Sequence, residues 1–313
     1  MSFFQSPAYY ELMKGLSEGE PFHQRLKSSA GDQTVILTGV RVANGGKVKK
    51  YFTSRIVIIG EPFTATNENI DTDNNIDWQF RKQTGGKSIY TEFRLLEPPV
   101  NKVFFHSLPF TFCLPYLNIL IDTTPTAENL YSKLSSTKKR QVHSSQKAGA
   151  YVRAAGNEKE VKSFYRILIE LYTNKIKKPL IAEEVLMRVF RDKSIGEILL
   201  VVFNEKIIGG MLCPVFEKQE MYEWYIGCLD DKMKQHKVYP SVLLTWEAIQ
   251  YAATHGYKRF NFMGAGEKGK PYGVRDFKLQ FGGNLVDAPR YIFVHKPLLY
   301  RLGKLAVRLG FGS

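Results

Sequence analysis

The sequence predicts a mixed α and β protein (class α+β) with two domains, and three observations support this prediction. The chain has 313 residues, which is enough for two domains of about 150 residues each. Hydrophobic residues make up 44% and charged residues 24% of the chain, as in proteins that bury a substantial core. Segments with the alternation of strands and segments with the spacing of helices follow one another in both halves. We therefore expect each domain to contain a mixed, mostly antiparallel sheet with packed helices.

The composition also indicates partners and compartment. Lys and Arg number 44 against 30 Asp and Glu, so the formal net charge is +14 and favours nucleic acid, an anionic membrane face or a phosphorylated substrate. The three cysteines, Cys113, Cys213 and Cys228, lie among apolar residues without metal-ligand spacing, which predicts buried free thiols and no bound metal. There is no signal-peptide pattern and no uncharged apolar run near the ~20 residues of a membrane span. We expect a cytoplasmic protein, with membrane association left open.

The first portion of the chain predicts strands around short turns. Residues 34–60 contain two strand-like segments on either side of the Asn-Gly-Gly sequence at 44–46, and a third apolar run at 55–59. Residues 61–77 are rich in Asn and Asp and predict a loop. A short helix, a Gly-Gly break and a strand follow.

A basic helix is predicted over 127–149, close to the expected domain boundary. Six Lys or Arg residues and no acid lie between Lys133 and Arg153. This concentration of like charge is typical of a solvated helix face, and the alternative is a surface that contacts phosphate.

The second portion predicts a helix, three consecutive strands, a second helix and a further strand. The first helix has apolar residues at helical spacing within 160–175. The strands occupy 197–228 and are separated by two polar turns. The second helix has Pro240 in its first turn and ends at Gly256, before the strand "RFNFM".

This order of elements resembles the acyltransferase (GNAT) superfamily, in which a glycine-rich turn at a helix N-terminus holds the pyrophosphate of coenzyme A. Such a turn needs glycines for close backbone approach and free amides for the anion. Here the corresponding stretch, 230–244, has no glycine, and Pro240 removes one amide donor.

The chain is more closely similar to the Fem family of aminoacyl-tRNA-dependent peptidyltransferases. Three stretches carry this resemblance: "STKKRQVHSSQKAG", "GYKRFNFMGAG" and "GVRDFKLQFGG". The resemblance implies two tandem GNAT-like domains, over 1–146 and 147–296, with the reaction centre in the second. It also implies a C-terminal basic helix over 297–313 that packs back on the first domain.

The resemblance further implies an activity and a catalytic lysine. Family members transfer an amino acid from aminoacyl-tRNA to an amine of a cell-wall precursor peptide, without coenzyme A. The lysine of the Phe-Lys pair becomes Lys278, with Phe277 beside it as a substrate contact. A cation there stabilises the negative tetrahedral intermediate and the leaving alkoxide. The alternative from the residues alone is a strand with Lys278 exposed and with Phe277, Leu279 and Phe281 inside.

The resemblance implies further contacts. Asp122 would hold the incoming amine, although it could equally cap the turn that follows it. Tyr225, Arg275, Arg140 and Lys147 are candidate substrate contacts, the last two for phosphate; burial is the alternative for Tyr225.

The tail and the donor leave rival functions open. Leu298, Leu302, Leu305 and Leu309 lie on one helical face away from Arg301, Lys304 and Arg308, which suits packing on the first domain or peripheral membrane contact through 297–313. We expect an amide-forming acyl or aminoacyl transferase with no bound cofactor. It would act on a cell-envelope precursor, a lipid-linked substrate or a related glycoconjugate, with aminoacyl-tRNA or acyl-CoA as donor and tRNA as a candidate partner. The rivals are an acyl-CoA-dependent N-acyltransferase and a non-catalytic protein that binds RNA or a membrane surface.

Overall fold

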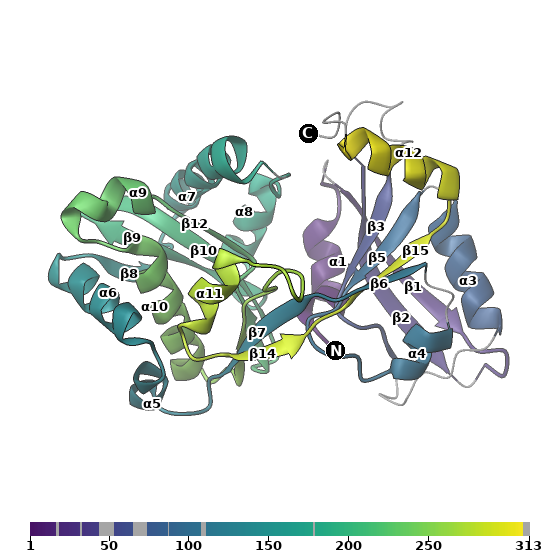
Figure 1. Cartoon of the computed structure of the whole chain (residues 1–313), viewed down its shortest axis with the longest axis horizontal. Coiled ribbons are helices and arrows are strands. Elements are labelled where there is room, and N and C mark those ends of the chain that lie inside the picture. The colour runs from purple at the N-terminus through teal and green to yellow at the C-terminus, as the bar shows by residue number, and fades with distance from the viewer. Residues whose placement is uncertain are drawn as a thin grey trace. The chain divides into compact units, whose positions relative to one another are not determined.

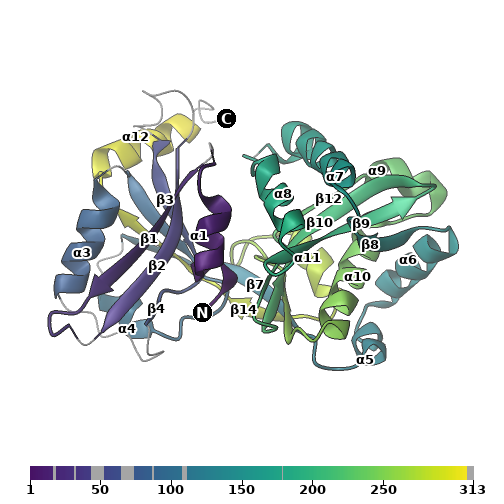
Figure 2. The same cartoon turned by 180° about the vertical axis from the view of Figure 1, so that it is seen from behind.

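The computed structural model of the chain describes residues 1–16, 19–31, 33–43, 53–64, 74–86, 88–107, 111–177 and 179–308. Contacts divide the chain into two units, Met1–Leu117 with Asp287–Ser313, and Asn118–Val286. Each unit contains one sheet with packed helices, which confirms the predicted α+β class with two domains (Figures 1 and 2). The predicted turn at 44–46 lies outside the described residues.

The sheet of the first unit has seven strands: β1 (Gly19–Lys27), β2 (Thr34–Val42), β3 (Arg55–Ile59), β4 (Phe63–Thr64), β5 (Tyr90–Arg94), β6 (Phe112–Leu114) and β15 (Arg290–Val294). Their order is β1-β2-β3-β5-β15-β6, with β4 paired to β2. The β3–β5 pair is parallel and the other pairs are antiparallel. The last strand along the chain, β15, therefore lies inside this sheet, between β5 and β6.

The first unit also contains η1 (Phe3–Gln5), α1 (Pro7–Met13), α3 (Asn74–Gly85), α4 (Lys102–Ser107) and α12 (Pro297–Arg308). Its core joins the sheet to α3 and α4, and its buried members are Leu26, Val35, Leu37, Ile56, Ile58, Ile76, Phe80, Phe93, Leu95, Phe104, Phe105 and Phe293. Cys113 is exposed on β6, contrary to the prediction of a buried thiol, whereas Cys213 and Cys228 are buried.

The sheet of the second unit has eight strands: β7 (Leu117–Asp122), β8 (Tyr151–Ala154), β9 (Gly196–Phe203), β10 (Lys206–Phe216), β11 (Glu220–Tyr222), β12 (Tyr225–Cys228), β13 (Arg259–Asn261) and β14 (Asn284–Asp287). Their order is β14-β7-β13-β11-β10-β9-β8, with β12 paired to β10. The β11–β13 pair is parallel. The antiparallel pairs are β7–β13, β8–β9, β9–β10, β10–β11 and β10–β12.

The helices of the second unit are α5 (Ala127–Ser132), α6 (Ser136–Lys147), α7 (Glu158–Leu171), η2 (Tyr172–Ile176), α8 (Glu183–Arg191), α9 (Asp230–Met233), η3 (Lys234–His236), α10 (Pro240–Thr254) and α11 (Gly273–Leu279). α7 and α10 cover opposite faces of the sheet (Figures 1 and 2). The predicted helix with Pro240 in its first turn is confirmed as α10, and the strand that follows it as β13.

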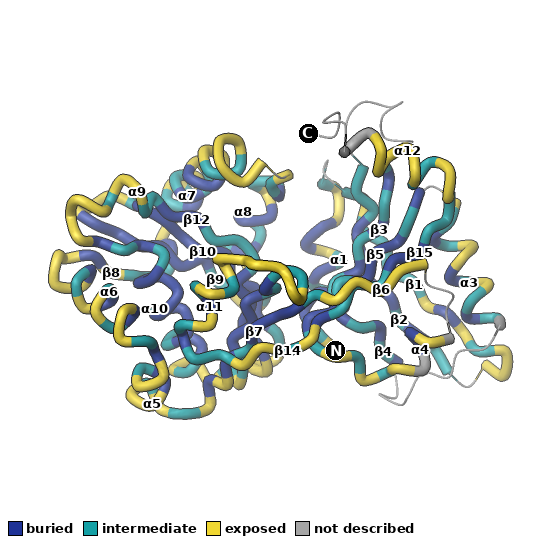
Figure 3. Tube along the Cα trace, viewed as in Figure 1, coloured by how far each residue is buried: buried dark blue, intermediate teal, exposed yellow. Residues whose placement is uncertain are grey.

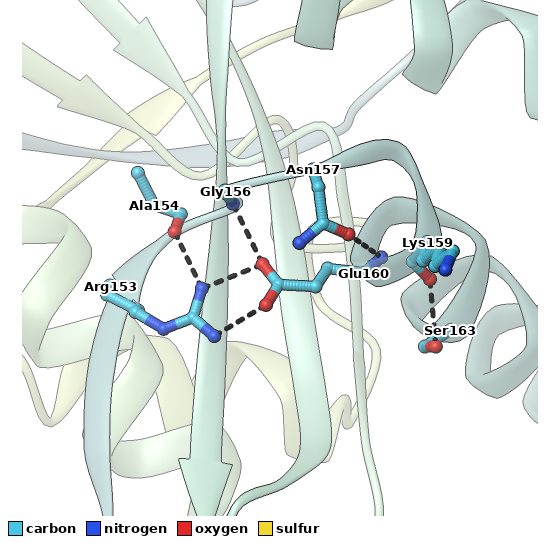
Figure 4. Close-up of polar contacts among 7 residues, drawn as sticks. All are labelled: Arg153, Ala154, Gly156, Asn157, Lys159, Glu160 and Ser163. Carbon is cyan, nitrogen blue, oxygen red and sulfur yellow. Dashed lines mark hydrogen bonds and ion pairs between the residues drawn. The ribbon is translucent and has the colours of Figure 1, made fainter.

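α7 begins where the sequence provides capping groups. The side chain of Asn157 accepts a hydrogen bond from the amide of Glu160, and the carboxylate of Glu160 accepts one from the amide of Gly156 (Figure 4). The same carboxylate receives two hydrogen bonds from Arg153, of 2.7 and 2.8 Å. The hydrogen bonds with Arg153 lower the pKa of Glu160 to about 2. This network ties the start of α7 to the end of β8.

Two predicted segments differ from the structure. The helix predicted over 127–149 is divided into α5 and α6. The stretch "GVRDFKLQFGG", predicted as a strand and turn, contains the helix α11. Its buried residues are Lys278 and Phe281, whereas Leu279 is exposed. One of the two buried residues is charged, so the buried side of this helix has no apolar helical spacing. The apolar residues at 277, 279 and 281 alternate as they would in a strand, which explains the wrong prediction.

The boundaries between the units also differ from the predicted 146/147 and 296/297, because the contacts place them at 117/118 and 286/287. β7 pairs with β13, and α6 packs on α10, so both belong to the second unit. β15 pairs with β5 and β6, so it belongs to the first. α12, inside the predicted 297–313, is also part of the first unit.

Candidate active site

The sheet of the second unit opens at the junction between β11 and β12. Met221 in β11 pairs with Val215 in β10, and Tyr225 in β12 pairs with Leu212. Three residues, 222–224, therefore lie opposite two, 213 and 214, which is a β-bulge. Beyond the bulge, β12 continues along β10.

The neighbouring strand β13 diverges from β12 at this point. It ends at Asn261, and the next residues bond to β7: the amide of Phe262 donates to the carbonyl of Ile119, and that of Gly264 to the side chain of Asn118. Met263 and Gly264 both have positive φ, of 59° and 136°, so the backbone makes a sharp turn that glycine favours. The sheet is consequently open between β12 and residues 262–264.

The side chain of Lys278 reaches into this opening from α11. Its Nζ donates to the carbonyl oxygens of Phe262 at 2.7 Å and Gly264 at 3.1 Å. It also forms an ion pair with Oε1 of Glu223 at 3.1 Å. Lys278 is only 8% exposed. The ammonium thus links the bulge on one side of the opening to the turn on the other.

Glu223 is the middle residue of the bulge, and its carboxylate is only partly used. It is 5% exposed, and its backbone amide donates to the carbonyl of Asn261. Its Oε2 is buried and has no hydrogen-bond partner. Burial raises the pKa of Glu223, and the positive charge of Lys278 offsets part of this rise. An unpaired buried carboxylate oxygen is costly, and it is available to receive a proton.

A buried polar network holds the turn in place. Asn118 donates to Oδ1 of Asn261, and Asn261 donates to the carboxylate of Glu220. The same Asn261 oxygen accepts the amide of Met263. All three side chains are buried, so the direction of the carbonyl groups that face Lys278 is set by the fold.

At the start of α10, where the GNAT superfamily binds a pyrophosphate, the backbone amides already have hydrogen-bond partners within the chain. The amide and hydroxyl of Ser241 both donate to Oδ1 of Asp230, at 3.0 and 2.9 Å. The amides of Val242 and Leu243 donate to the carbonyl of Tyr239. Pro240 has no amide hydrogen to donate. A carboxylate therefore already occupies the positive end of this helix.

The structure does not bring Phe277 and Arg275 to the opening with Lys278. The ring of Phe277 lies under the Nζ of Lys138, 4.0 Å from its centroid, and beside Phe281. Arg275 donates to the carbonyls of Ala265, Glu267 and Lys270, and so holds the 265–270 loop.

Asp122 also lies away from Lys278. It is exposed at the end of β7, and its Oδ1 accepts hydrogen bonds from the amide and hydroxyl of Thr124, which lower its pKa. It is four strand residues from Asn118, which meets the turn, and four residues span roughly 13 Å. Asp122 thus caps the turn after it, the alternative that the sequence had left open.

The remaining predicted residues are accessible. Tyr225 is half-buried at the start of β12, two residues after Glu223, with its ring 5.9 Å from that of Tyr172. Arg140 and Lys147 are exposed on α6, and seven residues of helix place them on one face.

Two residues of this region were not among the predicted ones. Glu223 lies in the mostly apolar segment "EMYEWYIGC", and its carboxylate between aromatic residues was the available signal. Lys138 is 5% exposed, and burial lowers its pKa, while the charge of Asp230 opposes this change. Its spacing of four from Val142 and seven from Ser145, both buried, places it on the inner face of α6.

The chain is similar in fold to several solved structures. A crystal structure of FemX superposes with a TM-score of 0.66 and 13% identity, over 96% of this chain and 94% of that one. L-PGS from Bacillus licheniformis gives 0.59 and 13%, over 99% and 98%. The C-terminal domain of a putative lysylphosphatidylglycerol synthetase from Agrobacterium fabrum gives 0.55 and 14%, over 91% and 88%. No curated protein sequence matches the chain.

These similarities show that the chain shares the fold of these proteins over nearly its whole length, and they agree with the predicted α+β class. Residues 204–308, which include Glu223, α10 and Lys278, match the FemAB family. This match confirms, over these residues, the predicted resemblance to the Fem family.

Proposed function

We propose that this protein forms an amide by transferring an acyl or aminoacyl group to an amine, at the opening occupied by Lys278 and Glu223. The observation that carries the proposal is the buried ion pair between these residues at 3.1 Å. A buried charge pair at a gap in a sheet contributes little net stability, and perturbed pairs of this kind gather at functional sites. The family match, which spans both residues, supports a transferase of acyl or aminoacyl groups.

The chemistry needs one cation and one proton acceptor. The amine nitrogen attacks the carbonyl carbon of the donor ester, a C–N bond forms, and the carbonyl oxygen becomes an oxyanion. The ammonium of Lys278 stabilises this charge by exchanging one of its carbonyl acceptors for it. The Oε2 of Glu223 accepts the proton that the nitrogen loses. The C–O bond then breaks, and the leaving alkoxide takes this proton from Glu223.

The start of α10 favours a donor other than coenzyme A. Its first-turn amides are bonded to Asp230 and Tyr239, and the carboxylate of Asp230 would repel a pyrophosphate. An aminoacyl-tRNA ester needs no such cradle. The exposed bases Arg140 and Lys147 on α6 are the proposed contacts for its phosphates, with Tyr225 at the opening as a proposed substrate contact. The proposed acceptor is an amine of a cell-envelope precursor or related glycoconjugate.

The test offers charged tRNA pools and acyl-CoAs to the purified protein with amine acceptors. We expect aminoacyl-tRNA to be consumed and acyl-CoA to remain. A Lys278→Met/Glu223→Leu double variant replaces both charges with apolar groups, so it can fold, and we expect it to react about 100- to 1000-fold more slowly. The control, Lys162→Met, removes an exposed lysine from α7 and should react like the natural protein.

Each arm can contradict one part of the proposal. Consumption of neither donor would contradict the transferase function. Consumption of acyl-CoA alone would contradict the donor. A folded double variant with full activity would contradict the roles of Lys278 and Glu223.

A further inference from the structure

The helix α12 exposes a row of leucine side chains to solvent. Leu298, Leu302 and Leu305 are 75%, 62% and 53% exposed. Their spacing of four and three residues places them on one side of the helix. Much of α12 is coloured as exposed in Figure 3. Amphipathic helices of globular proteins ordinarily turn such a face toward the core. In α12 the apolar face, which was expected to pack on the first unit, is turned toward solvent.

Another side of α12 holds the helix on its unit. The ring of Tyr300 is 5.3 Å from that of Tyr90 and stacks with Phe112 at 6.0 Å. Tyr300 is two residues after Leu298, which is a rotation of about 200°. The helix is therefore attached by its tyrosine side, and the leucine row faces away because of this attachment.

Basic side chains border the leucine row. Arg301 and Lys304 are exposed, and helical spacing places them between the leucines and Tyr300. The Nζ of Lys304 lies 5.1 Å from the ring of Phe112, which is itself 40% exposed. The sequence of α12 contains no acidic residue.

We propose that the α12 face, formed by Leu298, Leu302 and Leu305 with Arg301 and Lys304, binds the surface of an anionic lipid bilayer. The leucines enter the boundary between headgroups and acyl chains, and the bases remain at headgroup level beside anionic lipids. Charge complementarity favours this occupant over a second copy of the chain, because two copies would bring four bases of these faces together. The proposal is independent of the transferase function.

The test measures co-sedimentation of the full chain with phosphatidylcholine vesicles, with and without phosphatidylglycerol. We expect binding to the vesicles that contain phosphatidylglycerol, and weaker binding in high salt. Leu302→Asp should lower the partition coefficient at least about tenfold. Arg301→Ala and Lys304→Ala should each lower it about fivefold. The matched control, Lys159→Ala/Lys162→Ala, removes two exposed charges from α7 and should bind like the natural protein.

Four outcomes would overturn the proposal. The first is no binding to vesicles of either composition, and the second is equal binding by the natural protein and Leu302→Asp. The third is a dimer in light scattering that Leu302→Asp dissociates, which would assign the leucine row to a second copy. The fourth is a lower melting temperature for Leu302→Asp, which would show that the leucines pack within the chain.

Discussion

The ammonium of Lys278 has three N–H donors, and its three neighbours account for all of them. The acceptors are the carbonyls of Phe262 and Gly264 and the Oε1 of Glu223. The residue therefore closes the opening in the sheet as long as no substrate is bound. The proposed reaction exchanges one of these acceptors, so it links the stability of the site to its proposed reactivity.

This arrangement predicts that single and double substitutions lower the free energy of unfolding by different amounts. Lys278→Met should lower the free energy of unfolding by about 3 kcal/mol, because it leaves the Glu223 carboxylate buried without its cation. Lys278→Met/Glu223→Leu should recover most of this loss, because neither charge is then buried. Denaturant titration of the two variants and of Glu223→Leu gives the coupling free energy. Equal losses for the single and double variants would show that the two side chains act independently.

The sequence singled out Lys278 as a candidate but did not identify the groups that contact it. The lysine stands in a short motif shared with a family, so its number followed from local sequence. Glu223 is 55 positions earlier, and the pairing of the two depends on how β11, β13 and α11 meet. Asp122, which was predicted to hold the incoming amine, is on the same sheet, but its hydrogen bonds with Thr124 lie at the far end of β7.

Among the elements, helices with local start signals were the easiest to predict. α7 was predicted from its apolar spacing, and α10 from Pro240 in its first turn and Gly256 at its end. α11 was not predicted as a helix, because Lys278 occupies its buried side. The bulge between β11 and β12 was also not predicted, since strand periodicity continues through "EMYEWYIGC" and only pairing with β10 reveals the extra residue.

The end of β15 carries a pH-dependent contribution to stability. Burial, with the positive charges of Arg81 and Lys296, lowers the pKa of His295 from 6.5 to about 4. The neutral ring pairs with the hydroxyl of Thr91 at 2.8 Å. Because the unfolded chain takes up the proton first, this contribution is complete above pH 6.5 and is lost as the pH falls toward 4.

We therefore expect His295→Gln to remove part of the acid sensitivity of the first unit. The natural protein should lose about 1–2 kcal/mol more than the variant on acidification, a figure reduced for solvent screening of a partly exposed ring. Denaturant titration at a series of pH values measures this difference. His143→Gln, at an exposed position of α6, is the control and should keep the natural pH dependence. Parallel profiles for all three proteins would contradict the role of His295.

At the scale of the whole molecule, the first unit is discontinuous and the second is continuous. The chain leaves the first unit after Leu117 and returns at Asp287. β15 then pairs with both β5 and β6, so the first sheet is completed by the last strand along the chain. None of the helices in the described part of the chain has the length and apolarity needed to span a bilayer.

This topology predicts which fragments fold. Residues 118–286 should unfold cooperatively as an isolated fragment, since they contain a complete sheet and its helices. Residues 147–296 should not, because β7 and α6 are missing. Residues 1–117 should not, because without β15 the strands β5 and β6 have lost their shared partner. Circular dichroism melting curves distinguish these cases, and a cooperative transition for 147–296 would contradict the contact-based boundary.

The sequence by itself determined the fold class, the main helices and strands of the second unit and the Fem resemblance, and it singled out Lys278 as a candidate. These depend on periodicity, capping residues and short motifs, which are local. Only the tertiary structure decided the boundaries of the units, the pairing of Lys278 with Glu223, the carboxylate at the start of α10 and the outward leucine row of α12. Each of these depends on contacts between residues far apart in the chain, and such contacts leave no local pattern.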